Sequence, residues 1–139
     1  MTARCFADTN VFLYAASKDP ADEKKKAIAR ALLKGEDIGI SVQVLQEFAH
    51  NANAKKRLGL KSKETEAVLH SLLEYPVLPL TGELVLKAFG LQQRYQIGYW
   101  DAAIIAAAQE MGCRTLYSED LNAGQNYAGV VVRNPFADA

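Results

Sequence analysis

Short apolar segments alternate with amphipathic stretches along most of this chain, and this alternation limits the folds it can adopt. Five segments have the length and apolar content of buried strands: 4–7, 38–40, 77–80, 115–117 and 130–132. Stretches with helical spacing of apolar residues lie at 19–35, 41–51, 62–75, 81–95 and 99–111. This order is typical of a parallel sheet with helices on both faces. We therefore expect a three-layer α/β/α sandwich around a central, mainly parallel sheet of about five short strands.

Length and composition favour one globular domain over residues 1–139. Sixteen basic residues balance sixteen acidic ones, so any nucleic acid must be held by a local patch rather than by net charge. The two cysteines, Cys5 and Cys113, form no Cys-x-x-Cys motif, which argues against a zinc site or a disulfide framework. The longest apolar run, 102–108, is too short to span a bilayer, and no signal peptide is apparent. We expect a cytoplasmic protein with no membrane partner.

Three aspartates lie where an α/β sheet binds its ligands, beyond the carboxyl ends of the strands. Asp8 directly follows the first predicted strand, and Asp120 follows the strand 115–117. Asp101 lies in the first turn of a helix that is apolar on nearly all sides and must therefore be buried. Each acid alone could be an ordinary turn or first-turn residue, but their joint placement predicts that they meet at one edge of the sheet.

No lysine or arginine stands beside any of these aspartates in the sequence. Carboxylates gathered without cations repel one another unless a divalent ion holds them. Because no histidine or thiol joins the group, Mg²⁺ suits it better than zinc, and Mn²⁺ can substitute. Glu47 is a fourth candidate, although its place on the helical wheel is also that of a solvated glutamate.

Five short motifs together resemble the PIN-domain ribonucleases, and most of all the VapC-type toxins of bacterial type II toxin–antitoxin systems. The motifs are Asp8-Thr9-Asn10, Val44-Leu45-Gln46-Glu47-Phe48, Tyr99-Trp100-Asp101-Ala102, Ser118-Glu119-Asp120 and the terminal Asn134-Pro135-Phe136. The resemblance covers residues 4–136 and implies a PIN-like fold. Asn122 departs from the pattern, because many members carry a further aspartate there, and this bears on a second metal ion.

The resemblance implies a Mg²⁺-dependent endoribonuclease with its catalytic residues at the four acidic positions Asp8, Glu47, Asp101 and Asp120. Asp8 is then the central metal ligand, and Asp101 and Asp120 complete the metal site. Glu47 would hold or activate the attacking water, while Asn10 and Ser118 would orient the carboxylates. The basic cluster Lys55-Lys56-Arg57 is a candidate RNA contact, with a solvated loop as the alternative. We expect Trp100 to pack in the core.

A toxin of this kind would have RNA as its substrate and a cognate antitoxin protein as its partner, and would form a homodimer. We expect Leu58, Leu60 and the outer faces of the helices at 20–35 and 62–75 to receive the antitoxin. Three other functions stay open: a metal-binding phosphotransfer enzyme, a receiver-like signalling domain and a non-catalytic PIN-like interaction protein. Asn10 weakens the first because that chemistry needs an acid there, and segment 77–81 lacks the acid that the second needs.

Overall fold

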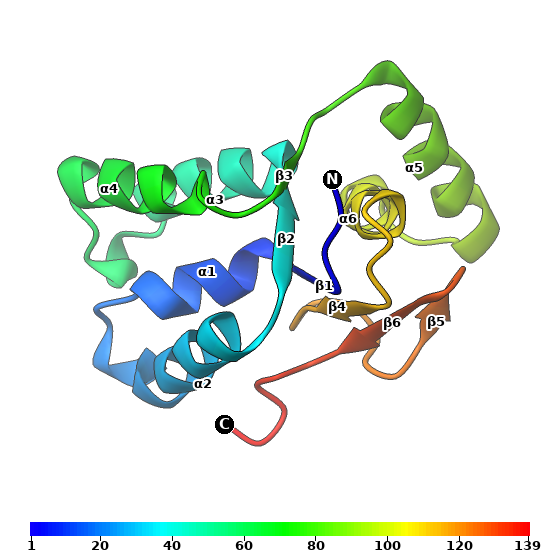
Figure 1. Ribbon diagram of the computed structural model, residues 1–139. Coiled ribbons are helices and arrows are strands. Elements are labelled where there is room, and N and C mark those ends of the chain that lie inside the picture. The colour runs from blue at the N-terminus through cyan, green and yellow to red at the C-terminus, as the bar shows by residue number, and fades with distance from the viewer.

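The computed structural model describes residues 1–139, and it contains one mixed sheet with helices on both sides (Figure 1). The strands are β1 (Cys5–Ala7), β2 (Ile38–Ser41), β3 (Val77–Leu78), β4 (Thr115–Tyr117), β5 (Asn126–Tyr127) and β6 (Val130–Arg133). The helices are α1 (Thr9–Ala16), α2 (Glu23–Gly35), α3 (Val42–Ala54), α4 (Ser62–Leu72), α5 (Gly82–Tyr95) and α6 (Tyr99–Glu110), with two 3₁₀ turns, η1 (Pro20–Asp22) and η2 (Lys56–Leu58).

The strand order is β3-β2-β1-β4-β6-β5, and every neighbouring pair is parallel except β5 and β6. The expected α/β class with a mainly parallel sheet is thus confirmed, with six strands instead of about five. The additional strand is β5, which has only two residues and returns to β6 through Ala128 and Gly129, both at positive φ. A strand of two residues is too short for an alternating pattern to reveal it.

Helix α1 is the second difference from the sequence prediction. It starts directly after β1, and Asp8 is its N-cap, with the side chain accepting a hydrogen bond from the Thr9 N–H. Val11, Phe12 and Leu13 are all buried, so the helix lacks the polar face that marks an amphipathic helix. The N-cap aspartate was the one helix-start signal in this segment.

The helices form two groups, one on each side of the sheet. In Figure 1, α1 to α4 lie on one side of β2, while α5 and α6 lie on the other. Helix α6 packs between α5 and the strands β2, β4 and β6, which explains its apolar sequence on all sides. The buried position expected for this helix is therefore confirmed.

Close packing at β2 requires a glycine. A Cβ added at Gly39 would lie 2.6 Å from the Met111 side chain and 2.9 Å from Ala3 Cβ. Cys5 and Cys113 are buried free thiols in the same core, as expected. The C-terminal segment crosses to α1, where the Phe136 ring meets Tyr14 edge-on at 4.8 Å. None of the helices has the length and apolar character needed to cross a bilayer.

Candidate active site

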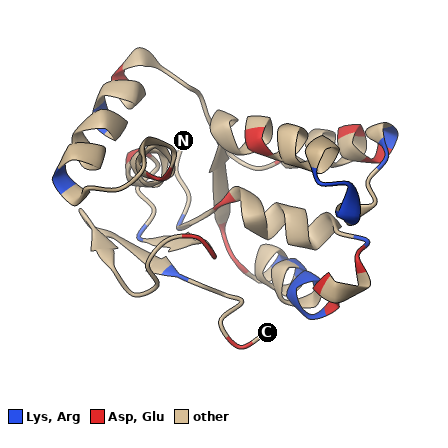
Figure 2. Cartoon of the chain, turned by 180° about the vertical axis from the view of Figure 1, so that it is seen from behind, with Lys and Arg blue, Asp and Glu red and all other residues tan.

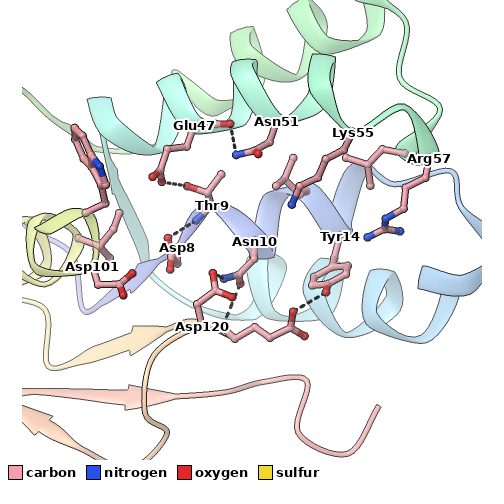
Figure 3. A pocket seen from close by; sticks show the side chains of 15 residues that line it. Asp8, Thr9, Asn10, Tyr14, Glu47, Asn51, Lys55, Arg57, Asp101 and Asp120 are labelled. Carbon is pink, nitrogen blue, oxygen red and sulfur yellow. Dashed lines mark hydrogen bonds between the residues drawn. The ribbon is translucent and has the colours of Figure 1, made fainter. Parts of the chain in front are cut away.

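Four carboxylates that are far apart in the sequence line one pocket of about 180 Å³ beyond the carboxyl ends of β1 and β4 (Figure 3). Asp8 follows β1, Asp120 follows β4, and Asp101 lies in the first turn of α6. Glu47 comes from the middle of α3, which begins where β2 ends. The predicted acids therefore share one site, which we call the acidic pocket. None of the four forms an ion pair with a lysine or arginine.

Asp8 is the most buried of these acids, with 6% of its surface exposed. Its Oδ1 accepts a hydrogen bond from the Thr9 N–H at 2.8 Å, and its Oδ2 accepts one from Ser118 Oγ at 2.7 Å. Burial raises the pKa of Asp8 to about 7, against the lowering effect of these two bonds, and the charges of Glu47 and Asp120 raise it further. An ionised carboxylate at this place is therefore costly unless a cation accompanies it.

Glu47 is held by two residues that the sequence analysis did not assign to the site. Thr9 Oγ1 donates to Glu47 Oε1 at 2.7 Å, and Gln43 Nε2 donates to Oε2 at 3.3 Å. The Gln43 amide also donates to the Trp100 carbonyl at 3.1 Å, which joins α3 to the start of α6. Gln43 precedes Glu47 by one helical turn, and this spacing was the available clue.

Asp101 is half-buried and faces the same pocket. Burial raises the pKa of its carboxyl group, and the nearby charges of Asp120 and Glu47 raise it further. Burial and the neighbouring acids thus raise the pKa values of two of the predicted ligands, and a bound cation would favour their ionised forms.

Asn10 and Ser118 contact the acids that they were predicted to orient. Asn10 Nδ2 donates to Asp120 Oδ2 at 3.2 Å. Ser118 Oγ, besides donating to Asp8, accepts a hydrogen bond from the Asp120 N–H at 3.1 Å. One hydroxyl group therefore connects the segments that carry Asp8 and Asp120.

Glu119 lies at the pocket, but a lysine neutralises it. Lys25 Nζ of α2 forms an ion pair with Glu119 Oε2 at 2.6 Å, and Tyr14 OH of α1 donates to Oε1 at 2.6 Å. Lys25 Nζ also lies 3.2 Å from Tyr14 OH and 4.8 Å from the centre of its ring. This network fixes the loop between Ser118 and Asp120 to two helices. Sequence analysis missed it, because Lys25 belongs to a lysine run that is typical of a solvated helix face.

The basic cluster lies at the far end of the pocket, and its three members differ. Lys55 lines the pocket without an acidic partner, whereas Lys56 is exposed and outside the lining. The Arg57 guanidinium pairs with Asp22 at 2.7 Å and Asp19 at 3.0 Å. Trp100 was expected in the core, and this was wrong: 68% of its surface is exposed, at the rim of the pocket.

The donors of the acidic pocket fit a divalent cation in kind and in charge. They are carboxylate oxygens that form no ion pair, although Lys55 and Arg57 line the far end of the pocket. Neither His50 nor His70 lines it. As the side chains stand, no three of them form a group that could hold a metal ion. Glu47 and Asp120 instead accept hydrogen bonds from neighbouring hydroxyl and amide groups.

Several solved structures have a similar fold. A toxin–antitoxin complex from Klebsiella pneumoniae matches with a TM-score of 0.68 and 18% identity, over 94% of this chain and 97% of that chain. VapBC2 from Rickettsia felis, bound to a DNA fragment from its promoter, matches with a TM-score of 0.66 and 20% identity, over 94% and 97%. VapC20 of Mycobacterium tuberculosis, a Sarcin-Ricin loop cleaving toxin, matches with a TM-score of 0.68 and 18% identity, over 84% and 91%. At these identities the likeness shows the fold alone.

No curated protein is significantly similar to this chain in sequence. The family model described as the PIN domain matches residues 5–127, which is most of the chain. That range includes Asp8, Glu47, Asp101 and Asp120. The chain therefore belongs to the PIN domain family.

Proposed function

We propose that this protein is a divalent-cation-dependent endoribonuclease. The observation that carries the proposal is the acidic pocket, where four carboxylates from separate segments meet without a lysine or arginine partner. Membership of the PIN family supports nuclease activity, and the structures of similar fold include a Sarcin-Ricin loop cleaving toxin. Of the two candidate cations, Mg²⁺ is the one we propose, with Mn²⁺ as its substitute.

The positions of the residues support the roles that we propose for them. A bound Mg²⁺ would offset the negative charge of the phosphodiester and make a water molecule a better nucleophile. Asp8, Asp101 and Asp120 would hold the ion, and Ser118 and Asn10 would keep the carboxylates of Asp8 and Asp120 oriented through the hydrogen bonds that they already donate. Glu47, fixed by Thr9 and Gln43, would orient the attacking water and receive its proton.

We infer that the biological setting is a toxin–antitoxin pair, because several structures of similar fold are toxin–antitoxin complexes. The expected antitoxin surface needs one correction. Leu58 is 1% exposed and belongs to the core, so it offers no contact to a partner. Leu60 is partly buried against the same core, whereas Leu73, just after α4, is 59% exposed. The apolar surface available on this side is therefore at the end of α4.

We also propose that the protein forms a homodimer, and α5 offers apolar surface for it. Leu86 and Phe89 of this helix are 74% and 55% exposed, and Val85 is 41% exposed. They lie on neighbouring turns of one helix, which is how an interface helix presents its anchors. Light scattering should give twice the monomer mass, and Leu86→Glu with Phe89→Glu should restore the monomer. A monomeric wild-type protein would contradict this arrangement.

The nuclease proposal is tested by incubating the purified protein with a mixed RNA pool, with Mg²⁺ or with EDTA, and separating the products on a gel. We expect fragments with Mg²⁺ and none with EDTA or with Asp8→Asn in Mg²⁺. Cleavage that continues in EDTA, or equal cleavage by Asp8→Asn, would contradict the proposal. Acid-labile phosphate on Asp8 after treatment with acetyl phosphate would favour a phosphotransfer or receiver function instead.

A further inference from the structure

Three arginines without any partner in the protein line one open depression of about 680 Å³ on the sheet, apart from the acidic pocket. Arg4 and Arg114 directly precede β1 and β4, and the Arg114 N–H donates to the Arg4 carbonyl at 3.2 Å. Arg133 ends β6, where it pairs in register with Tyr117. In Figure 2, blue segments lie at the strands of the sheet as well as on the helices. We call this feature the arginine depression.

The other three arginines of the chain are all engaged. Arg30 donates to the Ala15 carbonyl at 2.9 Å, Arg57 pairs with two aspartates, and Arg94 lies 5.0 Å from the centre of the Tyr95 ring. In contrast, the guanidinium groups of the arginine depression make no hydrogen bond and no ion pair. The three guanidinium groups that make no hydrogen bond, ion pair or cation–π contact therefore line one depression.

Two acids also line the arginine depression, yet they do not neutralise it. Asp37 Oδ2 accepts the backbone N–H of Arg4 at 3.1 Å, and Glu36 Oε2 accepts the Cys5 thiol at 3.8 Å. Neither carboxylate lies within ion-pair distance of a guanidinium. Three arginines against two acids leave a local positive charge, which favours an anionic ligand.

The spacing of the arginines along the strands favours an extended ligand over a single phosphate. Arg133 lies beside Tyr117 in the sheet, and Tyr117 follows Arg114 by three residues along β4. At about 3.3 Å per residue, the two arginines are therefore about 10 Å apart along the strand direction. Arginine binds phosphate through two parallel N–H···O bonds, so separated arginines suit successive phosphates. Tyr117, which is partly exposed and lies beside Arg133 in the sheet, adds an aromatic ring on which a base can stack.

The arginine depression is joined to the catalytic loop. Tyr117 immediately precedes Ser118, whose N–H donates to the Arg133 carbonyl at 3.1 Å. Resting on the proposed nuclease function, we propose that the arginine depression binds the phosphate backbone of the single-stranded part of the RNA substrate outside the cleavage pocket. It would add positive charge to that of Lys55 at the far end of the acidic pocket, and so hold the strand while the carboxylates act on one phosphodiester.

The test is RNA binding in EDTA, where cleavage is not required. Fluorescence anisotropy of a labelled single-stranded 12-nucleotide RNA is measured from 50 to 300 mM KCl with the wild type, Arg114→Gln/Arg133→Gln and the matched control Lys87→Gln/Arg94→Gln on α5. We expect the first variant to bind about tenfold more weakly, with a log–log salt slope less steep by about 1.4, which is about 0.7 for each phosphate that is no longer neutralised. The control should keep the wild-type slope.

Equal affinity and slope for the wild type and Arg114→Gln/Arg133→Gln would overturn the proposal, as would an equal loss in the control. The proposal would also be overturned if Arg114→Gln/Arg133→Gln lost affinity for an acidic peptide, measured in the same way, but bound RNA as tightly as the wild type. If the double variant does not fold, judged by its circular dichroism, the single variant Arg133→Gln at the exposed end of β6 is used, and half of the slope change is expected. Failure here with RNA cleavage intact refutes the arginine depression alone, whereas RNA binding without cleavage refutes the proposed nuclease.

Discussion

Two aspartates with the same burial have opposite surroundings in this molecule. Asp8 and Asp22 are each 6% exposed, and each accepts a short hydrogen bond from a serine, Ser118 to Asp8 and Ser17 to Asp22. Asp22 also pairs with the Arg57 guanidinium at 2.7 Å, which ties η2 to the turn after α1. Asp8 has no cation and instead faces Glu47 and Asp120. Burial alone therefore does not distinguish a candidate functional acid, whereas burial among other acids marks Asp8 as one.

The largest expected effect separates the two aspartates by activity. Asp8→Asn should lower Mg²⁺-dependent RNA cleavage by at least about a hundredfold, because it removes the carboxylate that we propose as the central metal ligand. Asp22→Asn should keep the cleavage rate of the folded protein while lowering the free energy of unfolding by roughly 1–2 kcal/mol, since it breaks a charged hydrogen bond. Gel-based cleavage rates and urea unfolding measure both. Equal cleavage by the wild type and Asp8→Asn would remove the distinction.

The second prediction concerns stability against pH in EDTA. The pKa of Asp8 is raised to about 7 in the folded protein from an ordinary value of 3.8, so the folded state binds more protons between these values. The contribution of Asp8 to stability is therefore fully present below pH 3.8 and is lost as the pH rises to about 7. An asparagine side chain does not ionise, so the variant Asp8→Asn does not lose stability in this way as the pH rises. Asp8→Asn should therefore be more stable than the wild type by roughly 1–3 kcal/mol at about pH 8.

Urea unfolding at about pH 5 and about pH 8 checks this prediction, with Asp22→Asn as the comparison. The advantage of Asp8→Asn over the wild type should grow between the two pH values. A variant that is less stable than the wild type at the higher pH would show that Asp8 has a structural role like that of Asp22.

A third prediction concerns Lys25, which neutralises Glu119 beside the acidic pocket as Arg57 neutralises Asp22. Lys25→Met should reduce RNA cleavage about tenfold and weaken Mn²⁺ binding, because the loop that carries Asp120 loses its link to α2. Lys26→Met is the matched control, since Lys26 forms no ion pair. Calorimetric titration with Mn²⁺ measures the Mn²⁺ affinity of each of the two variants. Identical Mn²⁺ affinities for both variants would mean that the network is purely structural.

The smallest effect is expected in the basic cluster. Lys55→Gln/Lys56→Gln should weaken RNA binding in EDTA a few fold and make the salt slope less steep by about 0.7 for each phosphate that these lysines neutralise in the wild type. Arg57→Gln should leave RNA affinity unchanged and lower stability instead, because its guanidinium already binds Asp19 and Asp22. A larger loss of RNA affinity in Arg57→Gln than in the lysine variant would reverse these assignments.

The sequence carried enough information to predict the fold class and the shared location of the acids, because strand and helix patterns determine which chain segments end at one sheet edge. It did not reveal α1, since a helix buried on most sides has no apolar stripe. It also did not reveal β5, which depends on its pairing with β6.

For a similar reason, the sequence indicated some of the hydrogen-bond and ion-pair partners of the acids but not others. Asn10 and Ser118 lie within two residues of an acid in the sequence, so a local motif could point to them. Lys25 and Arg57 meet their acids only through long-range packing, 94 and 35 residues apart. Local sequence shows these two as members of basic runs, and only the folded structure distinguishes them from solvated neighbours.

The most direct test of the central claim is a Mn²⁺ titration followed by electron paramagnetic resonance, comparing the wild type, Asp8→Asn and Asp22→Asn. If the acidic pocket is a metal site, the wild type and Asp22→Asn bind Mn²⁺ in the same way and Asp8→Asn does not. Absence of Mn²⁺ binding by the wild type, or the same binding by Asp8→Asn, would contradict the account.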